Sequence, residues 1–337
     1  METWMERLLT WYRANARALP WRQTKDAYCI WISEIMLQQT RVEAVRGYYA
    51  RFLEALPDVQ ALADVEEQRL LKLWEGLGYY SRARNLRLAA QRIVSQFGGQ
   101  LPADYDALLT LPGVGEYTAG AIASIAYGIA VPAVDGNVLR VMARLGNDPS
   151  DILDAAVKRR VRETLLRTMP KDEPGAFNQA LMELGATVCV PNGLPHCTDC
   201  PVFGDCLARS AGTAAALPVK RGKKARRVEE KTVFVLRAGH AVAGYRRPDT
   251  GLLASLWQLP EAAGALDADA MARRLDGWGA RPLGAWRLYE RRYIFTHVEW
   301  RMHVCAVEVE LPVLPEGWIW MDETVHALPT AYRVCLS

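Results

Sequence analysis

No apolar run in this chain of 337 residues approaches the roughly 18–20 residues that a helix needs to cross a bilayer. A secretory signal peptide is missing as well, since the opening METWMERLLTWYR carries two glutamates and reads as an amphipathic helix. Without an export signal, three cysteines are expected to be free thiols in a reducing cytosol: Cys29, Cys305 and Cys335. We therefore expect a cytoplasmic protein that does not enter a membrane.

The sequence has a small net charge and few phenylalanines. A net charge of +3 permits a polyanionic partner but does not require one. Only six phenylalanines accompany eleven tryptophans and thirteen tyrosines, whose polar edges suit base stacking, although core packing is their commonest use. Half of the residues are hydrophobic and 23% are charged, so the composition indicates a globular protein of two ordinary or three small domains.

The spacing of apolar residues changes once along the chain. From residue 1 to 210 apolar positions recur at intervals of three and four, as in 42–56 and 83–97, which predicts a helical domain. Residues 232–337 have a period near two, with one short helix predicted at 268–278, and this pattern indicates a smaller α+β domain.

A basic stretch, residues 211–231, joins the two regions. Six of the eight residues from Lys220 to Arg227 are lysine or arginine. Such a run is commonly a solvated linker, and it also suits contacts with phosphates. The sequence leaves both interpretations open.

Four cysteines follow one another closely in the stretch C-VPNGLPH-C-TD-C-PVFGD-C, at Cys189, Cys197, Cys200 and Cys206. The prolines and glycines between them suit tight turns, so four thiolates can reach one centre. A tetrahedral zinc and an iron–sulfur cluster both accept four thiolates, and the alternatives are two structural disulfides or unrelated buried thiols. Because nothing else in the chain is typical of a secreted protein, we favour a metal centre in this loop, residues 189–206.

The segment ALLTLPGVGEYTAGAIASIAYG, residues 107–128, predicts a helix that ends near Leu111, a tight turn at 112–115 and a second helix. Gly113 and Gly115 carry no side chain where the backbone must approach another molecule closely. The exposed N–H groups at the start of the second helix, near Glu116, can bind a phosphate without reading sequence. The segment therefore predicts a helix-hairpin-helix that binds nucleic acid, with a plain helical turn as the alternative.

Two carboxylates are candidates for catalysis. Glu34 lies among mostly apolar residues, and a carboxyl that is desolvated there has the raised pKa that a general acid needs. Asp135 lies in VDGNV, between an apolar stretch and a helix predicted at 138–145. The alternatives are an exposed helix glutamate in the first case and an ordinary capping or turn aspartate in the second. Spacing alone does not decide between them.

These features occur together with six segments: PWR at 20–22, SEIMLQQT at 33–40, GLGYYSRARNL at 76–86, LPGVG at 111–115, VDGNV at 134–138 and FNQALMELG at 177–185. With the cysteine run they resemble the endonuclease III superfamily of base-excision DNA glycosylases, and within it the adenine glycosylases. The resemblance implies a DNA repair enzyme that flips adenine, mispaired with 8-oxoguanine or guanine, out of duplex DNA. Such an enzyme cuts the N-glycosidic bond and leaves an abasic site, and we expect it to be a monomer associated with the nucleoid.

The resemblance also implies roles for single residues. Glu34 matches the acid that protonates adenine N7 and later helps to activate water, and Asp135 matches the carboxylate that stabilises the oxocarbenium-like sugar. Tyr117 and Asn137 match residues that support this centre. Bifunctional relatives place a Schiff-base lysine at the position of Tyr117, so its phenol implies a monofunctional glycosylase. The implied substrate and DNA contacts are Arg22 and Gln179 in the adenine pocket, Gln39 and Tyr79 as wedges in the base stack, and Gly113 and Gly115 at a phosphate.

The same resemblance selects a [4Fe–4S] cluster as the cofactor held by Cys189, Cys197, Cys200 and Cys206. The first gap between these cysteines is seven residues here, where the family usually has six. A loop rich in proline and glycine can absorb one extra residue.

The C-terminal region resembles the Nudix-like domain of the family through GLLASLWQLP at 251–260 and YIFTH at 293–297. The acidic box with which Nudix hydrolases bind metal is absent from the sequence, so nucleotide hydrolysis is not expected. Phe295, Thr296 and His297 match the loop that recognises 8-oxoguanine, with threonine where serine is frequent. The alternative for Thr296 and His297 is a pair of residues on a strand surface.

Two other functions are compatible with parts of the sequence. A mismatch thymine or uracil glycosylase of the same superfamily shares the helical half and the cluster, but it does not need the second domain. A non-catalytic DNA-binding module keeps the hairpin and the basic linker without requiring Glu34 and Asp135.

Overall fold

The fold is that of a computed structural model, which describes residues 3–222 and 225–337. Two cations of the basic run, Lys223 and Lys224, therefore lie outside the described residues. Within the described part of the chain, no helix is both long enough and apolar enough to cross a membrane.

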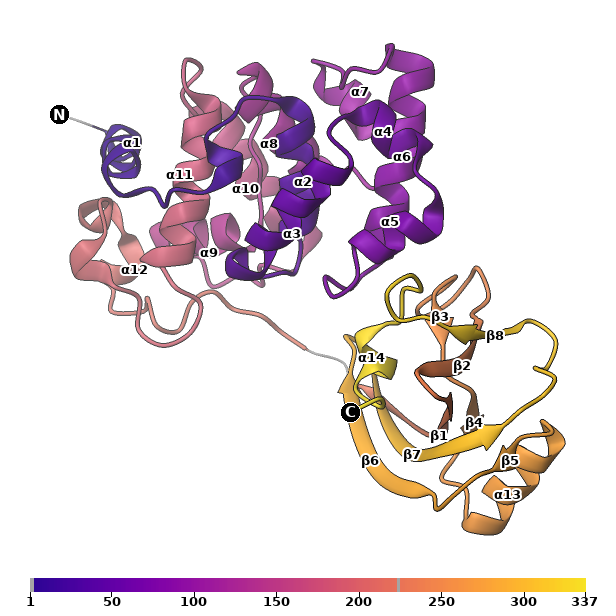
Figure 1. The fold of residues 1–337 in the computed structure, drawn as a ribbon. Coiled ribbons are helices and arrows are strands. Elements are labelled where there is room, and N and C mark those ends of the chain that lie inside the picture. Colours follow the sequence, from indigo (N-terminus) through magenta and orange to yellow (C-terminus); the bar gives the residue numbers. More distant parts are fainter. Residues whose placement is uncertain (1–2, 223–224) are drawn as a thin grey trace. The chain divides into compact units, whose positions relative to one another are not determined.

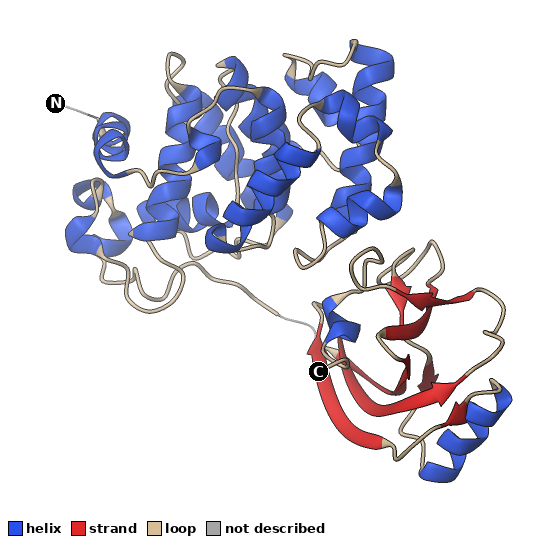
Figure 2. Cartoon of the chain, in the orientation of Figure 1, coloured by secondary structure: helices blue, strands red, loops and turns tan. Residues whose placement is uncertain are grey.

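The chain divides into two compact units. One comprises Met1–Asp64 and Asn85–Gly222, and the other comprises Val65–Arg84 and Lys223–Ser337. Figure 2 shows helices throughout the first unit and strands in the second. We call them the helical unit and the sheet unit.

The helical unit confirms the helical pattern expected for the first part of the chain (Figure 1). Its elements are α1 (Trp4–Asn15), η1 (Pro20–Arg22), α2 (Ala27–Leu37), α3 (Val42–Ala55), α4 (Val59–Asp64), most of α6 (Ser81–Phe97), α7 (Tyr105–Leu109), α8 (Glu116–Tyr127), α9 (Gly136–Leu145), α10 (Ala155–Thr168), α11 (Pro174–Thr187), η2 (Cys197–Asp199), η3 (Phe203–Asp205) and α12 (Leu207–Ser210).

Helix α2 lies in the core of this unit. A helix that is apolar on every face is buried on every face, and Ile30, Trp31, Ile32 and Met36 are at most 1% exposed. The helix begins at the N-cap Asp26, whose side chain accepts hydrogen bonds from two backbone N–H groups of the first turn. Because α2 packs against both α3 and α8, any polar side chain on its middle turns is removed from water.

Asn178 joins three segments of the helical unit. It is fully buried on α11, and its Nδ2 donates to Ser124 Oγ (2.8 Å) and to the carbonyl of Val131 (2.9 Å). Its Oδ1 accepts from the backbone N–H of Ala133 at 3.1 Å. Asn178 therefore provides hydrogen-bond partners for the backbone of the extended segment that leads into α9. This segment belongs to no helix or sheet that would supply such partners.

The sheet unit is built around two long strands. Strand β1 (Arg227–Ala238) runs parallel to β7 (Val298–Glu310), and the other strands attach to one of these two or to β2. The remaining elements are α5 (Glu67–Leu73), β2 (Ala241–Arg246), β3 (Trp257–Gln258), β4 (Glu261–Ala263), α13 (Ala268–Gly277), β5 (Arg281–Pro282), β6 (Arg287–Ile294), β8 (Trp318–Met321) and α14 (Thr330–Arg333).

Alternation along β1 gives the sheet two apolar faces. Val233 and Val235 pack in the cluster that includes Tyr332, the largest buried residue of α14. Phe234 and Leu236 belong to the opposite cluster, which includes Met271 and other residues of α13. Helices therefore cover both faces, as the long apolar run of β1 requires.

Two boundaries differ from those expected from the sequence. Strand β1 begins at Arg227, inside the stretch 211–231 that composition indicates as a linker, because residues 227–231 pair with β7. Residues Val65–Arg84, predicted within the helical region and observed as helix and loop, group with the sheet unit. Both differences arise from contacts with residues far along the chain.

Replacing Asn178 with leucine should destabilise the helical unit by about 3 kcal/mol, because it leaves a buried backbone N–H and a buried carbonyl without partners. Urea denaturation followed by circular dichroism measures the change. The control is Gln96→Leu on the exposed surface of α6, which should change stability by less than about 0.5 kcal/mol. Equal stability of the Asn178→Leu protein and the wild type would contradict the role given to this side chain.

Candidate active site

A cavity of about 660 Å³ opens in the helical unit. Its walls come from α2, α8, α9, α11 and the segment around η1. It brings together seven residues that the sequence analysis singles out: Arg22, Glu34, Gln39, Tyr117, Asp135, Asn137 and Gln179. The remaining candidates, which are Tyr79, Gly113, Gly115, residues 295–297 and the four cysteines, do not line this cavity.

Glu34 is nearly inaccessible, with 6% of its surface exposed. Its Oε2 accepts a hydrogen bond from the Tyr117 hydroxyl at 2.5 Å. Burial raises the pKa of Glu34 to about 7, assisted by the negative charge of Asp135 and opposed by the Tyr117 hydrogen bond. The alternative of an exposed helix glutamate is therefore wrong, and near neutral pH a large share of this carboxyl holds its proton.

Asp135 is the N-cap of α9, so its carboxylate has a fixed orientation. Oδ1 accepts from the backbone N–H of Val138, and Oδ2 accepts from Asn137 Nδ2, both at 2.7 Å. Burial raises the pKa of Asp135, while these hydrogen bonds act in the opposite direction. Asp135 is therefore a capping aspartate, as the alternative states, and it also lines the cavity. The two roles are compatible, because the capping hydrogen bonds orient the side chain.

Asn137 is itself held by a buried arginine. Arg140, 4% exposed, donates through Nη2 to Asn137 Oδ1 and to the carbonyl of Gly185, and through Nε to the carbonyl of Cys189, each at 2.8 Å. A side chain at Gly185 would place its Cβ only 2.6 Å from the Asn137 Cβ, so the glycine permits this approach of α11 to α9. Arg144, one turn later, donates to Cys189 Sγ at 3.2 Å. Hydrogen bonds thus run from the cavity to the cysteine loop.

The sequence analysis missed Glu183 as part of the cavity. Its side chain is fully buried, and it accepts hydrogen bonds from Arg17 Nη2 (2.8 Å) and Arg22 Nη2 (2.7 Å). Burial alone would raise the pKa of Glu183, but the hydrogen bonds from the two arginines outweigh it and hold the pKa at about 2. Helical spacing could have found this residue, since it lies four positions after Gln179 on α11.

The predicted helix-hairpin-helix is present as α7, a turn and α8. The first helix ends at Leu109, two residues before the end predicted near Leu111. Gly113 has φ +76°, and a Cβ there would lie 2.7 Å from the Asn85 Cβ, so glycine is required. Gly115 is the N-cap of α8 and supplies no side-chain cap, and it is exposed together with Glu116.

The two residues expected as wedges share an unusual backbone. Gln39 and Tyr79 have φ of +58° and +47°, a region that non-glycine residues seldom occupy. Both are exposed, and 45% of the Tyr79 surface is accessible. Strained residues of this kind gather at functional sites.

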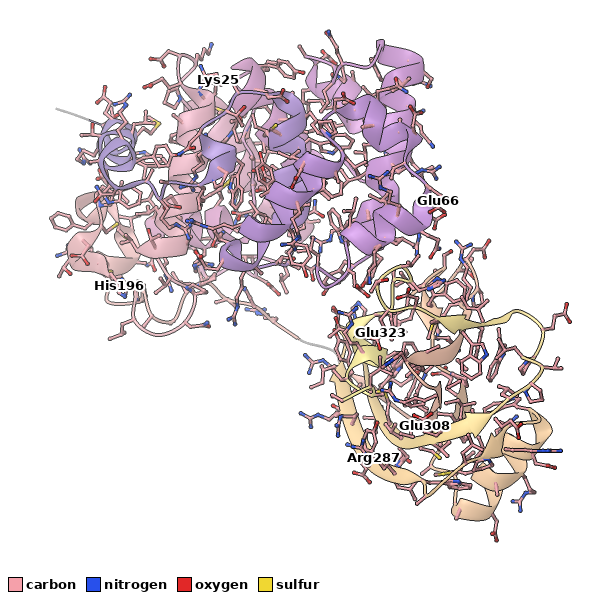
Figure 3. The ribbon with its side chains drawn as sticks, in the orientation of Figure 1. Lys25, Glu66, His196, Arg287, Glu308 and Glu323 are labelled. Carbon is pink, nitrogen blue, oxygen red and sulfur yellow. The ribbon has the colours of Figure 1, made fainter. Side chains whose placement is uncertain are left out.

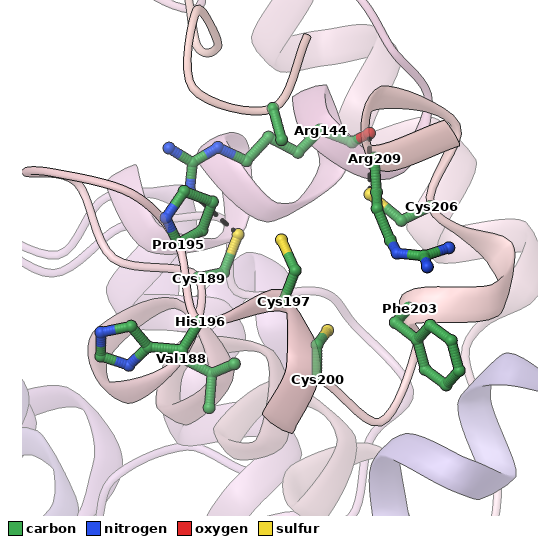
Figure 4. A pocket seen from close by; sticks show the side chains of 11 residues that line it. Arg144, Val188, Cys189, Pro195, His196, Cys197, Cys200, Phe203, Cys206 and Arg209 are labelled. Carbon is green, nitrogen blue, oxygen red and sulfur yellow. Dashed lines mark hydrogen bonds between the residues drawn. The ribbon is translucent and has the colours of Figure 1, made fainter. Parts of the chain in front are cut away.

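The four cysteines of the loop line one pocket together with Arg144, and their thiols face its interior (Figure 4). They form no disulfide, so the disulfide alternative is wrong. Among the residues that the structure describes, no three or more His, Cys, Asp or Glu side chains converge as ligands of a single metal ion. The four cysteines nevertheless line one pocket.

Residues 295–297 connect β6 to β7 in the sheet unit. The backbone N–H of Phe295 donates to the carbonyl of Val298 at 2.8 Å, which leaves Thr296 and His297 exposed at a two-residue turn. The Phe295 ring packs between Tyr293 and Trp300, each 4.8 Å away between ring centroids. Thr296 and His297 are thus a turn, and the alternative of a strand surface pair is wrong.

Comparison with known proteins agrees with this geometry. Residues 32–167 match the family described as "HhH-GPD superfamily base excision DNA repair protein", and residues 232–337 match the NUDIX domain. The adenine DNA glycosylase of Homo sapiens is 36% identical over 97% of this chain and 72% of its own length. That of Mus musculus is 35% identical over 95% and 74%. A thermostable thymine-DNA glycosylase superposes with a TM-score of 0.57 at 28% identity, over 61% of this chain and 95% of its own.

A helical unit of this fold with buried carboxyls in one cavity defines a DNA glycosylase of base excision repair, which hydrolyses N-glycosidic bonds. A thymine or uracil mismatch enzyme would not need the second domain, and the relatives match across both domains. The chain belongs to the adenine DNA glycosylase family.

The raised pKa of Glu34 can be tested by protein stability alone. A glutamate in the unfolded chain titrates near 4.5, while Glu34 in the fold titrates near 7, so folding favours the protonated form. The wild type should therefore lose stability relative to Glu34→Gln as the pH rises from 4.5 to 7. The full loss is roughly 3 kcal/mol, measured by urea denaturation at several pH values.

The matched control is Glu43→Gln, because the Glu43 side chain is 80% exposed. Its stability difference from the wild type should be small. A stability difference for Glu34→Gln that does not change with pH would mean that Glu34 titrates as it does in the unfolded chain.

Proposed function

We propose that this protein removes adenine paired with 8-oxoguanine or guanine in duplex DNA and leaves an abasic site. The observation that carries the proposal is the cavity in which the buried Glu34 and the half-buried Asp135, two carboxyls in unlike surroundings, face one space. Two carboxyls with different proton affinities can divide acid and charge-stabilising roles in cleaving a glycosidic bond.

Glu34 is the general acid in this proposal. Adenine is a poor leaving group until its ring is protonated, and a carboxyl that keeps its proton near neutral pH can deliver it to N7. The Tyr117 hydroxyl, which donates to Oε2, holds the carboxyl in one orientation. After the bond breaks, the carboxylate that remains can accept a proton from the attacking water.

Asp135 stabilises the positive charge that develops on the sugar. Val138 and Asn137 donate hydrogen bonds to its oxygens and so favour the ionised form. The phenol of Tyr117 cannot form a Schiff base, so the reaction stops at the abasic site without cutting the strand.

The base is recognised at the end of the cavity that Arg22 and Gln179 line. Arg22 is fixed by Glu183, and Gln179 Oε1 accepts a hydrogen bond from the Tyr12 hydroxyl at 3.1 Å. Groups that are fixed before the base arrives lose little entropy on binding it. We propose that Glu183 acts on the base chiefly by holding Arg22 in place.

The DNA backbone binds at the turn before α8, through Gly113, Gly115 and the N–H groups that follow them. The exposed side chains of Gln39 and Tyr79 enter the stack that the flipped adenine leaves. On the other strand, the turn formed by Phe295, Thr296 and His297 reads 8-oxoguanine. The Phe295 contacts with Tyr293 and Trp300 hold this turn against the sheet.

The cysteine loop holds a [4Fe–4S] cluster. In such a cluster each iron takes one thiolate, so the four cysteines that line this pocket supply its full set of protein ligands. Arg144 supports the fit, because its guanidinium donates to Cys189 Sγ and stabilises a thiolate there. The cluster shapes the loop, and bond cleavage does not pass through it.

The proposed function is tested by single-turnover cleavage of duplexes that carry adenine opposite 8-oxoguanine, guanine, cytosine or thymine. We expect cleavage to be fastest opposite 8-oxoguanine and slower opposite guanine, with an unbroken strand until alkali is added. Equal rates opposite all four bases would contradict the proposed specificity. Strand breaks without alkali would contradict the monofunctional assignment.

Within that assay, Glu34→Gln should slow base release roughly 10²–10⁴-fold, because the amide cannot donate an acidic proton. Binding of the same duplex, measured by fluorescence anisotropy, should persist. The exposed Glu43→Gln protein is the control and should match the wild type. Base release at the wild-type rate by Glu34→Gln would refute Glu34 as the acid.

The cofactor proposal predicts about four iron atoms for each chain of protein purified without oxygen. Replacing Cys200 with alanine should lower the iron content and the visible absorbance of the cluster. Elemental analysis that finds about one zinc and no iron would contradict the proposal and favour a tetrahedral zinc site.

A further inference from the structure

The segment Val65–Arg84 lies in the helical half of the sequence but belongs to the sheet unit. It contains α5 and the loop that presents Tyr79. Its attachment to residues 225–337 is polar and specific, and three of the contacts lie at Lys72 and Glu75, near the end of α5.

One carboxylate is central to this attachment. The Glu75 side chain is 10% exposed, and it accepts hydrogen bonds from the backbone N–H of Leu328 (2.9 Å), from Lys72 Nζ (2.7 Å) and from Arg333 Nη2 (2.7 Å). Leu328 lies just before α14, and Arg333 is the last residue of that helix. Two cations and an amide around one carboxylate fit a charged group much better than a neutral one.

Other contacts join the same surfaces. Trp257 Nε1 donates to Gln68 Oε1 at 2.9 Å, and the Arg84 guanidinium donates to the carbonyl of Ala254. Lys72 Nζ also donates, at 2.5 Å, to the carbonyl of Glu323, which is labelled in Figure 3. The segment Val65–Arg84 is thus bound to the rest of the sheet unit along its length. Glu75 accepts the largest number of these hydrogen bonds.

The loop between Glu75 and Tyr79 has little freedom of its own. Gly76 and Gly78 have φ of +99° and +69°. Trp74 Nε1 and Arg82 Nη2 both donate to the carbonyl of Gly78, each at 3.1 Å. A shift of Glu75 is therefore passed on to Tyr79.

Tyr79 ends against the turn that the proposed function assigns to 8-oxoguanine. Its hydroxyl lies 2.7 Å from Thr296 Oγ1, within hydrogen-bonding distance. Both groups are exposed, so a contact of this kind persists only if the two backbones are held in register.

We propose that Glu75 is a positioning residue for selection of the opposite base. By clamping Val65–Arg84 to the sheet unit, it sets Tyr79 beside Thr296, so that the wedge and the base-reading turn meet the DNA as one part. This inference rests on the proposed function, because it gives Glu75 its effect through the recognition of 8-oxoguanine.

Glu75→Gln tests the clamp, because it keeps the size of the side chain and removes its charge. We expect the rate ratio for adenine opposite 8-oxoguanine against guanine to fall about tenfold, as for loss of a hydrogen bond to a charged group. The rate opposite guanine should stay within about twofold of the wild type. The control is Glu316→Gln, an exposed glutamate of the same unit, which should leave the ratio unchanged.

A second readout separates positioning from general stability. In a Thr296→Val background, which already lacks the hydroxyl that meets Tyr79, Glu75→Gln should lower the ratio little further. If Glu75→Gln does not fold, Trp257→Phe replaces it, because this change removes only the donor to Gln68 and should lower the ratio in the same direction.

The outcomes are distinct. A wild type without preference for 8-oxoguanine refutes the proposed function. A normal preference in the wild type that persists in Glu75→Gln, or additive effects of Glu75→Gln and Thr296→Val, refutes the positioning role. Equal losses opposite 8-oxoguanine and guanine would show a role in DNA binding at large and also overturn the inference.

Discussion

The removal of one carboxyl from water is the constraint on which the cavity depends. Glu34 lies on a helix whose neighbouring side chains are apolar and almost fully buried, and Tyr117 is the partner that its Oε2 meets. A charge in such surroundings is costly, so the carboxyl retains its proton to a far higher pH than an exposed glutamate does. The packing of α2 against α8 thereby sets a chemical property of the site.

Burial also raises the pKa of Asp135, but more hydrogen bonds oppose that rise than at Glu34. The position of Asp135 at the N-terminus of α9 supplies hydrogen bonds to both oxygens, and Asn137, Arg140 and Gly185 keep those donors in place. Asn178 fixes the extended segment that precedes it. The two acids share a rise in pKa but differ in their hydrogen-bond partners, and in the proposed reaction this difference separates the proton donor from the stabilising anion.

Local patterns in the sequence predict much of this fold. Helix α3 is observed where apolar spacing predicts it, Glu34 is buried as its apolar neighbours predict, and Asp135 lies directly before a helix as expected. Contacts between residues far apart in the sequence could not be predicted from local patterns. The charge of Glu183 gave no sign that two arginines from another segment would neutralise it, and the helical pattern of Val65–Arg84 gave no sign that this segment belongs to the sheet unit. The start of β1 at Arg227 likewise depends on a partner strand about seventy residues later.

The protonation state of Glu34 is the property on which the account of catalysis rests, and it can be observed directly. Infrared difference spectra of the wild type against Glu34→Gln isolate the carbonyl stretch of the protonated Glu34 carboxyl. Recorded over a range of pH, this band should disappear with a midpoint near pH 7. A midpoint near 4.5, the ordinary value for glutamate, would mean that Glu34 is ionised at neutral pH and would contradict the account.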